Sequence, residues 1–231
     1  MNQKQRVVAL AAVAFVLLLA TGCVTNVPLQ DSFWDESGKT VGVAVVTFPE
    51  PGVFRSGSQG ALDVLINSAT TADLAERLRS FDPSAFVAIR EEVAAVLRER
   101  GMRPVIIEEL IDVETLPEAA EGGGRHDRDY SELGQRYGVD NLVLLSIEAV
   151  GAARNYYGFI AVGAPRGYCV GSGELIDLTT NQLMWRYTMS YNNSRVRADG
   201  PWRNPPDYPE MLAATAQAVD QAVADVTDSL R

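Results

Sequence analysis

The sequence has few of the residues that build common metal and nucleic-acid sites. It contains two cysteines and one histidine in 231 residues, too few for a zinc site made of Cys and His side chains. It has 20 basic against 30 acidic residues and a net charge of −10 at pH 7. The basic residues are scattered among acids and do not form the clusters that bind a phosphate backbone. We therefore predict no nucleic-acid partner.

A run long enough to cross a membrane is also missing, although the chain begins with an apolar stretch. Lys4 and Arg6 are the only charged residues before Cys23. The apolar run 7–19 has about 13 residues, whereas a helix that crosses a bilayer needs roughly 20. A positive start followed by a short apolar run is typical of an export signal that is later removed.

The apolar run ends in Leu19-Ala20-Thr21-Gly22-Cys23. These residues resemble the lipobox of bacterial lipoproteins, in which small residues precede a cysteine. The resemblance implies cleavage between Gly22 and Cys23, a lipid on Cys23, and attachment of the mature chain to a membrane of the cell envelope. The alternative is an ordinary signal-peptidase site followed by a chance cysteine. Val24 is not the aspartate that resembles an inner-membrane retention signal, which favours the outer membrane with the chain facing the periplasm.

Removal of residues 1–22 makes the chain more acidic. It takes away two of the 20 basic residues and none of the 30 acidic ones, so the net charge falls from −10 to −12. Anionic headgroups repel such a chain, which leaves the lipid on Cys23 as its attachment to the membrane. Cys169 then has no cysteine partner within the chain. We interpret it as a small buried apolar residue, with a reactive thiol as the alternative.

The mature chain predicts a tether followed by one folded domain. Residues 23–40 are polar and irregular and are expected to form a lipidated N-terminus and a flexible tether, with Phe33 and Trp34 as the residues that could instead pack back on the domain. Residues 41–231 predict a single α/β domain, a mixed sheet of about five strands with helices packed on it. The expected strands are 41–48, 105–111, 142–150, 168–178 and 183–191. Helical spacing runs over 62–78, broken by the polar patch 67–71, and further helices are expected over 83–100, 129–138 and 211–230.

Two segments of this domain resemble a family of periplasmic domains. Residues 130–144 read Tyr-Ser-Glu-Leu-Gly-Gln-Arg-Tyr-Gly-Val-Asp-Asn-Leu-Val-Leu, and residues 173–185 read Gly-Glu-Leu-Ile-Asp-Leu-Thr-Thr-Asn-Gln-Leu-Met-Trp. They are similar to a helix-to-strand element and a hairpin found in the TolB N-terminal domain and in curli secretion-channel lipoproteins. The resemblance implies an α/β fold and a role in envelope assembly, but no reaction. Segment 155–166 is too short for the paired transmembrane hairpins of channel-forming members.

The sequence contains no recognisable catalytic constellation. We predict a protein that is not an enzyme and that has no catalytic residues, metal or cofactor. His126 lies in the glycine-rich segment 118–128 and is interpreted as exposed linker. The alternative function is a hydrolase or a small-ligand-binding lipoprotein, which a pocket gathering His126, Cys169 and a carboxylate would favour.

Segment 154–166 is apolar and aromatic where a connection between strands is usually polar. It is either an extension of the flanking strands around a turn or an exposed patch that binds a partner. In the second case the candidate partner-binding residues are Tyr156, Tyr157, Phe159 and Ile160. We therefore predict a membrane-anchored, non-enzymatic module that binds another envelope protein in the periplasm, in an oligomeric state that the sequence leaves open.

Overall fold

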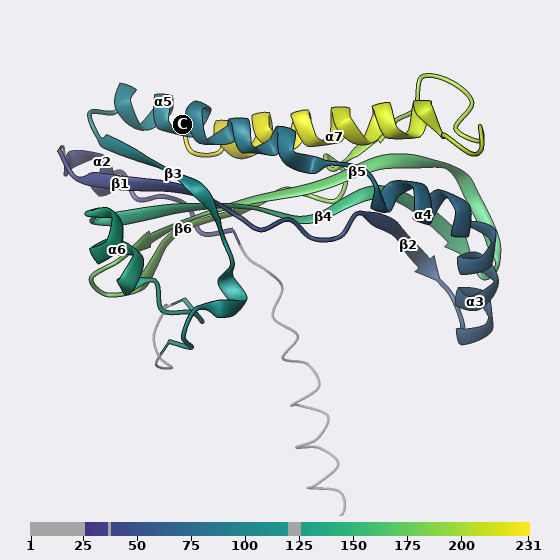
Figure 1. Cartoon of the computed structure of the whole chain (residues 1–231), viewed down its shortest axis with the longest axis horizontal. Helices are drawn as coiled ribbons and strands as arrows, with labels where there is room; N and C mark the ends of the chain where they lie inside the picture. The colour runs from purple at the N-terminus through teal and green to yellow at the C-terminus, as the bar shows by residue number, and fades with distance from the viewer. Residues whose placement is uncertain (1–25, 37, 120–125) are drawn as a thin grey trace, which may run out of the picture.

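The computed structural model describes residues 26–36, 38–119 and 126–231 (Figure 1). The elements in chain order are α2 (Ser32–Asp35), β1 (Thr40–Val46), β2 (Gly52–Ser58), α3 (Ala61–Thr70), α4 (Ala72–Arg79), the 3-10 turn η1 (Pro83–Ala88), α5 (Ile89–Glu99), β3 (Arg103–Ile111), the 3-10 turn η2 (Val113–Thr115), α6 (Ser131–Tyr137), β4 (Asn141–Tyr157), β5 (Ile160–Asp177), β6 (Gln182–Thr188), β7 (Arg195–Arg197) and α7 (Pro209–Asp228).

These strands form one mixed sheet in which a long hairpin is the spine. The strand order is β3-β1-β4-β5-β6, with β2 beside β4 and β7 beside β5. The antiparallel strands β4 and β5 have 17 and 18 residues. Strands β1 and β2 run parallel to β4 along successive parts of its length, while β6 and β7 run antiparallel to β5. The predicted α/β fold is confirmed, and the short strands β2 and β7 are additional to the five predicted.

Helices cover both faces of the sheet, but unequally. Figure 1 shows α5 and α7 side by side on one face and α6 on the other. The larger core lies beneath α5 and α7, with members that include Ile89, Val93, Val143, Val219 and Val226. A second core lies beneath α6 and includes Tyr130, Leu133, Leu142 and Ile176. A third and smaller cluster joins α4 to the start of α7. Apolar residues on both faces explain why β1 and the first half of β4 are almost wholly apolar.

The predicted helix 83–100 is divided into two parts. The Asp82 carboxylate accepts a hydrogen bond from the Ser84 N–H at 2.9 Å, and Pro83 follows as the first residue of η1. This cap and proline start the segment as predicted. The first six residues form the 3-10 turn η1, and α5 continues from Ile89.

A β-bulge in the β5–β6 pairing changes which face each side chain of β6 occupies. Leu175 pairs with Trp185, whereas Ile176 pairs with Leu183, so Met184 is the extra residue. Trp185 consequently lies in the core beneath α7 and Leu183 packs against the core beneath α6. Strict alternation along a strand would place Leu183 and Trp185 on the same face, but the bulge shifts the register by one residue and separates them.

Much of the segment expected to be a flexible tether lies on the domain. Val27 pairs with Arg186 of β6 in an antiparallel bridge, and the Asn26 side-chain oxygen accepts a hydrogen bond from the Thr188 N–H at 2.9 Å. Phe33 of α2 is 2% exposed within the larger core. One buried ring therefore fixes a segment whose composition is otherwise polar. Gly22 and Cys23 lie outside the described residues.

Candidate functional site

Helix α3 turns its apolar side chains outward. Four of its ten residues are exposed large apolar residues: Leu62 (69%), Val64 (44%), Leu65 (69%) and Ile66 (41%). Its one buried residue is Asn67, whose amide donates hydrogen bonds to the Gln59 side-chain oxygen at 2.8 Å and to the Gly158 carbonyl at 3.1 Å. A helix normally turns its apolar stripe to the core, so this arrangement requires a further explanation.

The tip of the β4–β5 hairpin presents a second set of exposed apolar side chains. Tyr157 is 73% exposed, Phe159 64%, Ile160 58% and Val162 56%. The turn itself consists of Gly158 and Phe159, with Gly158 in the left-handed conformation at φ 58°. Segment 154–166 therefore extends the flanking strands around a turn and also exposes an apolar surface. That this exposed surface binds a partner stays a prediction.

Tyr156 does not belong to the exposed set. It is 3% exposed, because neighbouring residues of a strand point to opposite faces and Tyr157 takes the outward position. The Arg154 guanidinium lies 5.7 Å from the centre of its ring. Of the four candidate partner-binding residues, Tyr157, Phe159 and Ile160 are accessible, while Tyr156 belongs to the support beneath them.

Hydrogen bonds hold the hairpin tip against β2 and α3. The Gly158 N–H donates to the Ser58 carbonyl at 2.8 Å, and the Gly158 carbonyl accepts the Asn67 amide from α3. We call the eight exposed side chains the apolar end: Leu62, Val64, Leu65, Ile66, Tyr157, Phe159, Ile160 and Val162. In the described part of the chain, two other large apolar residues are exposed outside the apolar end, Leu110 and Tyr191. Figure 1 shows α3 and the hairpin tip at the end of the molecule opposite α2 and α6.

Large exposed apolar patches on monomers usually mark interaction sites. The apolar end was only half visible in the sequence, because the spacing of Leu62, Leu65 and Ile66 is that of an ordinary core-facing helix. The available signal was Asn67, a polar residue at a position that the helical spacing would otherwise give to the core.

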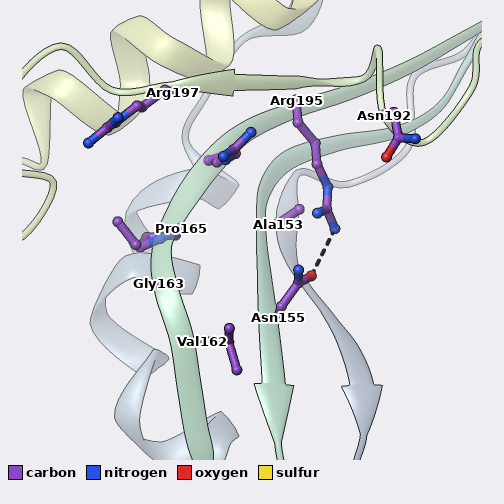
Figure 2. A pocket seen from close by; sticks show the side chains of 10 residues that line it. Ala153, Asn155, Val162, Gly163, Pro165, Asn192, Arg195 and Arg197 are labelled. Carbon is purple, nitrogen blue, oxygen red and sulfur yellow. Dashed lines mark hydrogen bonds between the residues drawn. The ribbon is translucent and has the colours of Figure 1, made fainter.

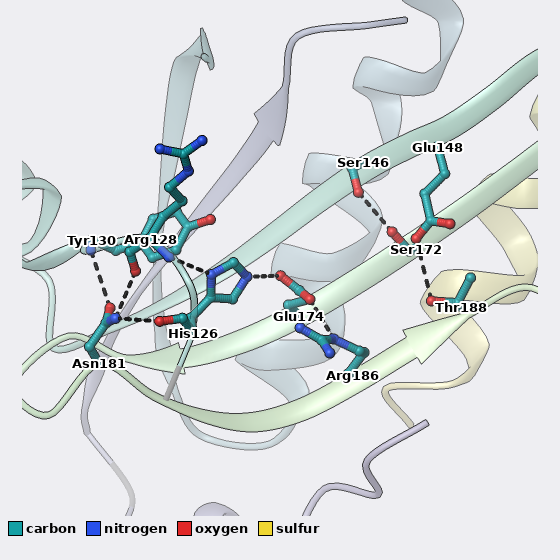
Figure 3. A network of polar contacts seen from close by, with 10 residues as sticks. All are labelled: His126, Arg128, Tyr130, Ser146, Glu148, Ser172, Glu174, Asn181, Arg186 and Thr188. Atoms are coloured by element: carbon teal, nitrogen blue, oxygen red, sulfur yellow. Dashed lines mark hydrogen bonds and ion pairs between the residues drawn. The ribbon is translucent and has the colours of Figure 1, made fainter. Parts of the chain in front are cut away.

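A second, polar cluster lies on the opposite face of the sheet from α7 (Figure 3). The Glu174 carboxylate accepts a hydrogen bond from Arg186 Nε at 2.6 Å and contacts His126 Nε2 at 2.8 Å. His126 Nδ1 accepts the Arg128 N–H at 3.2 Å, so its proton is on Nε2 and is donated to Glu174. Burial raises the pKa of the Glu174 carboxyl, but the His126 hydrogen bond and the nearby positive charges outweigh it and lower the pKa overall.

The interpretation of His126 as exposed linker is wrong. Its side chain is 14% exposed, and its ring packs edge-on against Tyr130 with 4.9 Å between the ring centres. Asn181 holds the same segment by accepting the Tyr130 N–H and donating to the Arg128 carbonyl at 2.7 Å. Because both ring nitrogens have partners, we assign His126 a structural role in fixing the segment before α6.

Cys169 lies on the other face of β5. It is fully buried in the core beneath α7, and burial raises the pKa of its thiol to about 12. Cys169 is therefore the small buried apolar residue predicted from the sequence. Glu174 and His126 are on the opposite face, so the pocket that would combine His126, Cys169 and a carboxylate does not form.

Two further properties concern metal and membrane sites. Across residues 26–36, 38–119 and 126–231, no group of three or more His, Cys, Asp or Glu side chains is placed to hold a metal ion. None of the helices in this part of the chain combines the length and apolarity needed to span a membrane.

The chain matches no protein-family model and no curated protein sequence. Among solved structures, it is similar to the PelC dodecamer from Paraburkholderia phytofirmans (11% identity, TM-score 0.29, 85% of this chain and 94% of that one). It is also similar to the lipoprotein GNA1162 from Neisseria meningitidis (13%, TM-score 0.29, 81% and 99%) and to the LpoB C-terminal domain from Escherichia coli (10%, TM-score 0.20, 78% and 89%). These structures include a bacterial lipoprotein and an oligomeric assembly. TM-scores below 0.5 are too low to transfer a binding site from them.

Proposed function

We propose that this chain is an envelope lipoprotein, anchored by lipid on Cys23 to the periplasmic side of the outer membrane, that docks a partner protein through its apolar end. The observation that carries the docking function is the exposure of Tyr157, Phe159 and Leu65 at one end of the molecule. The anchor is supported by the apolar run 7–19 and the lipobox-like residues that end at Cys23.

The chemistry of the apolar end favours a protein partner over a lipid surface. Helices that lie on membranes are usually rich in Lys and Arg around the apolar face. Within 61–70 and 157–162 the only charged residue is Asp63, which an anionic membrane would repel. Aromatic anchors on a hydrogen-bonded turn are, in contrast, the residues that dominate many protein interfaces.

The docking function is tested with the double variant Tyr157→Ala, Phe159→Ala in the lipidated protein. Both rings are more than 60% exposed, so the melting temperature should change little, while partner affinity should fall by about 2 kcal/mol or more. Leu110→Ala, at an exposed apolar residue outside the apolar end, is the matched control and should retain the partner. Tyr156→Ala, beneath the surface, should instead lower the melting temperature because it removes a buried ring.

Site-specific photo-crosslinking identifies what covers the apolar end. A crosslinker at position 159 should join one defined envelope protein in native membranes, and a crosslinker at position 110 should not. Labelling of lipid from position 159 would contradict the protein partner. A crosslinked homodimer, together with self-association that the double variant abolishes, would assign the surface to a second copy of the chain.

The anchor is tested independently with Cys23→Ser. This change should abolish labelling by a palmitate analogue and leave the precursor unprocessed, because the thioether on the cysteine is the recognised feature. Equal labelling of wild type and variant would refute the lipoprotein assignment without affecting the docking test.

A further inference from the structure

A cavity of about 420 Å³ lies along the hairpin next to the apolar end, and Val162 of the apolar end is one of its lining residues (Figure 2). Its walls come from β4, β5, β7 and the loop that precedes β7. The polar side chains that line it are Arg166, Arg195, Arg197, Asn155 and Asn192. No acidic residue lines it, although the chain has 30 acidic residues and a net charge of −10.

Strand register places the three arginines on one face of the sheet. Arg166 of β5 pairs directly with Arg197 of β7, and directly opposed residues project from the same face of a sheet. Arg195 is two residues before Arg197 on the same strand and shares that face. Like charges placed directly opposite each other destabilise a sheet. Among the described residues, none of the three forms an ion pair with a carboxylate within 4.0 Å, so their repulsion is uncompensated.

Arg195 is held in place by its surroundings. Its guanidinium lies 3.4 Å from the centre of the Tyr191 ring and donates to the Asn155 side-chain oxygen at 3.1 Å. Figure 2 shows it extending from β7 toward Asn155. Arg195 Nε is buried and has no hydrogen-bond partner among the described residues. Burial, together with the charge of Arg166, lowers the pKa of the Arg195 guanidinium. The positive charge of Arg195 is therefore only partly compensated by its neighbours.

We propose that this cavity binds a phosphate group, carried either by a soluble phosphate ester or by a phospholipid headgroup. A single guanidinium can satisfy a carboxylate through two parallel hydrogen bonds. Arg195 and Arg197 leave β7 in different directions in Figure 2, so the three arginines favour a ligand through their combined positive charge. That charge, with no acidic residue in the lining, suits an anion with up to two negative charges, which is the chemistry of a phosphate monoester. The volume is within the range of small-molecule sites, roughly 300–1,000 Å³.

The test uses the full chain purified in neutral detergent, titrated calorimetrically with inorganic phosphate and with glycerol 3-phosphate. We expect saturable binding in the low millimolar range or tighter. The double variant Arg166→Gln, Arg197→Gln changes two exposed side chains and should raise the dissociation constant at least about tenfold, as expected for the loss of charged hydrogen bonds. The control, Arg79→Gln with Arg98→Gln, removes two exposed arginines elsewhere and should change the dissociation constant less than about twofold.

Further binding measurements distinguish between the possible ligands. Acetate bound as tightly as phosphate would overturn the phosphate assignment. Absence of phosphate binding by the wild type, or an equal loss in the control variant, would overturn the site itself. Flotation with phosphatidylglycerol vesicles, compared with phosphatidylcholine vesicles, identifies the source. Binding to the anionic vesicles that requires Arg166 and Arg197 supports a lipid headgroup, and binding of glycerol 3-phosphate without vesicle binding supports a soluble ester.

Discussion

The contact between Trp185 and Gly173 offers a sharp test of the core beneath α7. Trp185 is 3% exposed, and a Cβ atom added to Gly173 would lie 2.5 Å from its ring atom Cη2. A buried Trp removes about 150–250 Å² from water, which at roughly 25 cal/mol per Å² corresponds to about 4–6 kcal/mol. Measured losses for truncation to alanine are about 3–5 kcal/mol. In a domain of this size, Trp185→Ala should therefore lower the melting temperature by roughly 10 °C.

A substitution at Gly173 tests the contact with Trp185 separately from the burial of the Trp185 ring. Gly173→Ala should also destabilise the domain, because the new methyl group displaces the Trp185 ring. In the double variant the methyl group occupies space that the ring has left. The combined loss should therefore be smaller than the sum of the single losses, with a coupling energy of about 1 kcal/mol or more. Denaturant unfolding of the full chain measures all three variants. An unchanged melting temperature for Trp185→Ala would refute the packing described. So would a loss of stability in the double variant equal to the sum of the two single losses.

Two further predictions concern ionisable groups. Because the Glu174 pKa is lowered in the folded state, its charge stabilises the fold above the unfolded pKa of about 4.3, and this contribution is lost as the pH falls below that value. Glu174→Gln should lower the free energy of unfolding by about 1.5–3 kcal/mol at pH 7 and by much less near pH 3. Denaturant titrations at both pH values measure this difference. An equal loss of stability at both pH values would contradict the role of the Glu174 charge. In a Cys23→Ser chain, the Cys169 thiol, with its pKa raised to about 12, should resist iodoacetamide at pH 8 until the protein is unfolded; rapid alkylation of the native protein would show an accessible thiol.

The elements of the main sheet were predictable from local patterns. β1 and the first half of β4 are apolar because both of their faces are buried. The turn before β6 follows from Asp177, whose carboxylate accepts the Thr179 and Thr180 N–H groups at 3.0 and 2.8 Å. In each case the controlling interaction is local in sequence or follows directly from burial.

The features that escaped prediction depend on contacts distant in sequence. Strand β2 has no apolar alternation and is defined by pairing with β4, about a hundred residues later. His126 looks like linker until β5 supplies Glu174. The arginine cavity arises only when β7, three residues long, pairs with β5. Similarly, the buried position of Asn67 on α3 involves a hydrogen bond to Gly158, which is 91 residues later in the sequence.

The bridge between Val27 and Arg186 determines where any force from an anchor enters the fold. Three Cα–Cα steps separate Cys23 from Asn26, so a lipid on Cys23 would hold the β6 edge within about 11 Å of the lipidated residue. Thr188, which contacts Asn26, pairs with Ser172 and through it aligns with Ser146 of β4. From Ser146 to Tyr157, β4 advances eleven residues, roughly 35 Å of strand. The anchor would then hold one end of the β4–β5 hairpin near the bilayer. The aromatic tip at the other end would lie a few nanometres from the anchor.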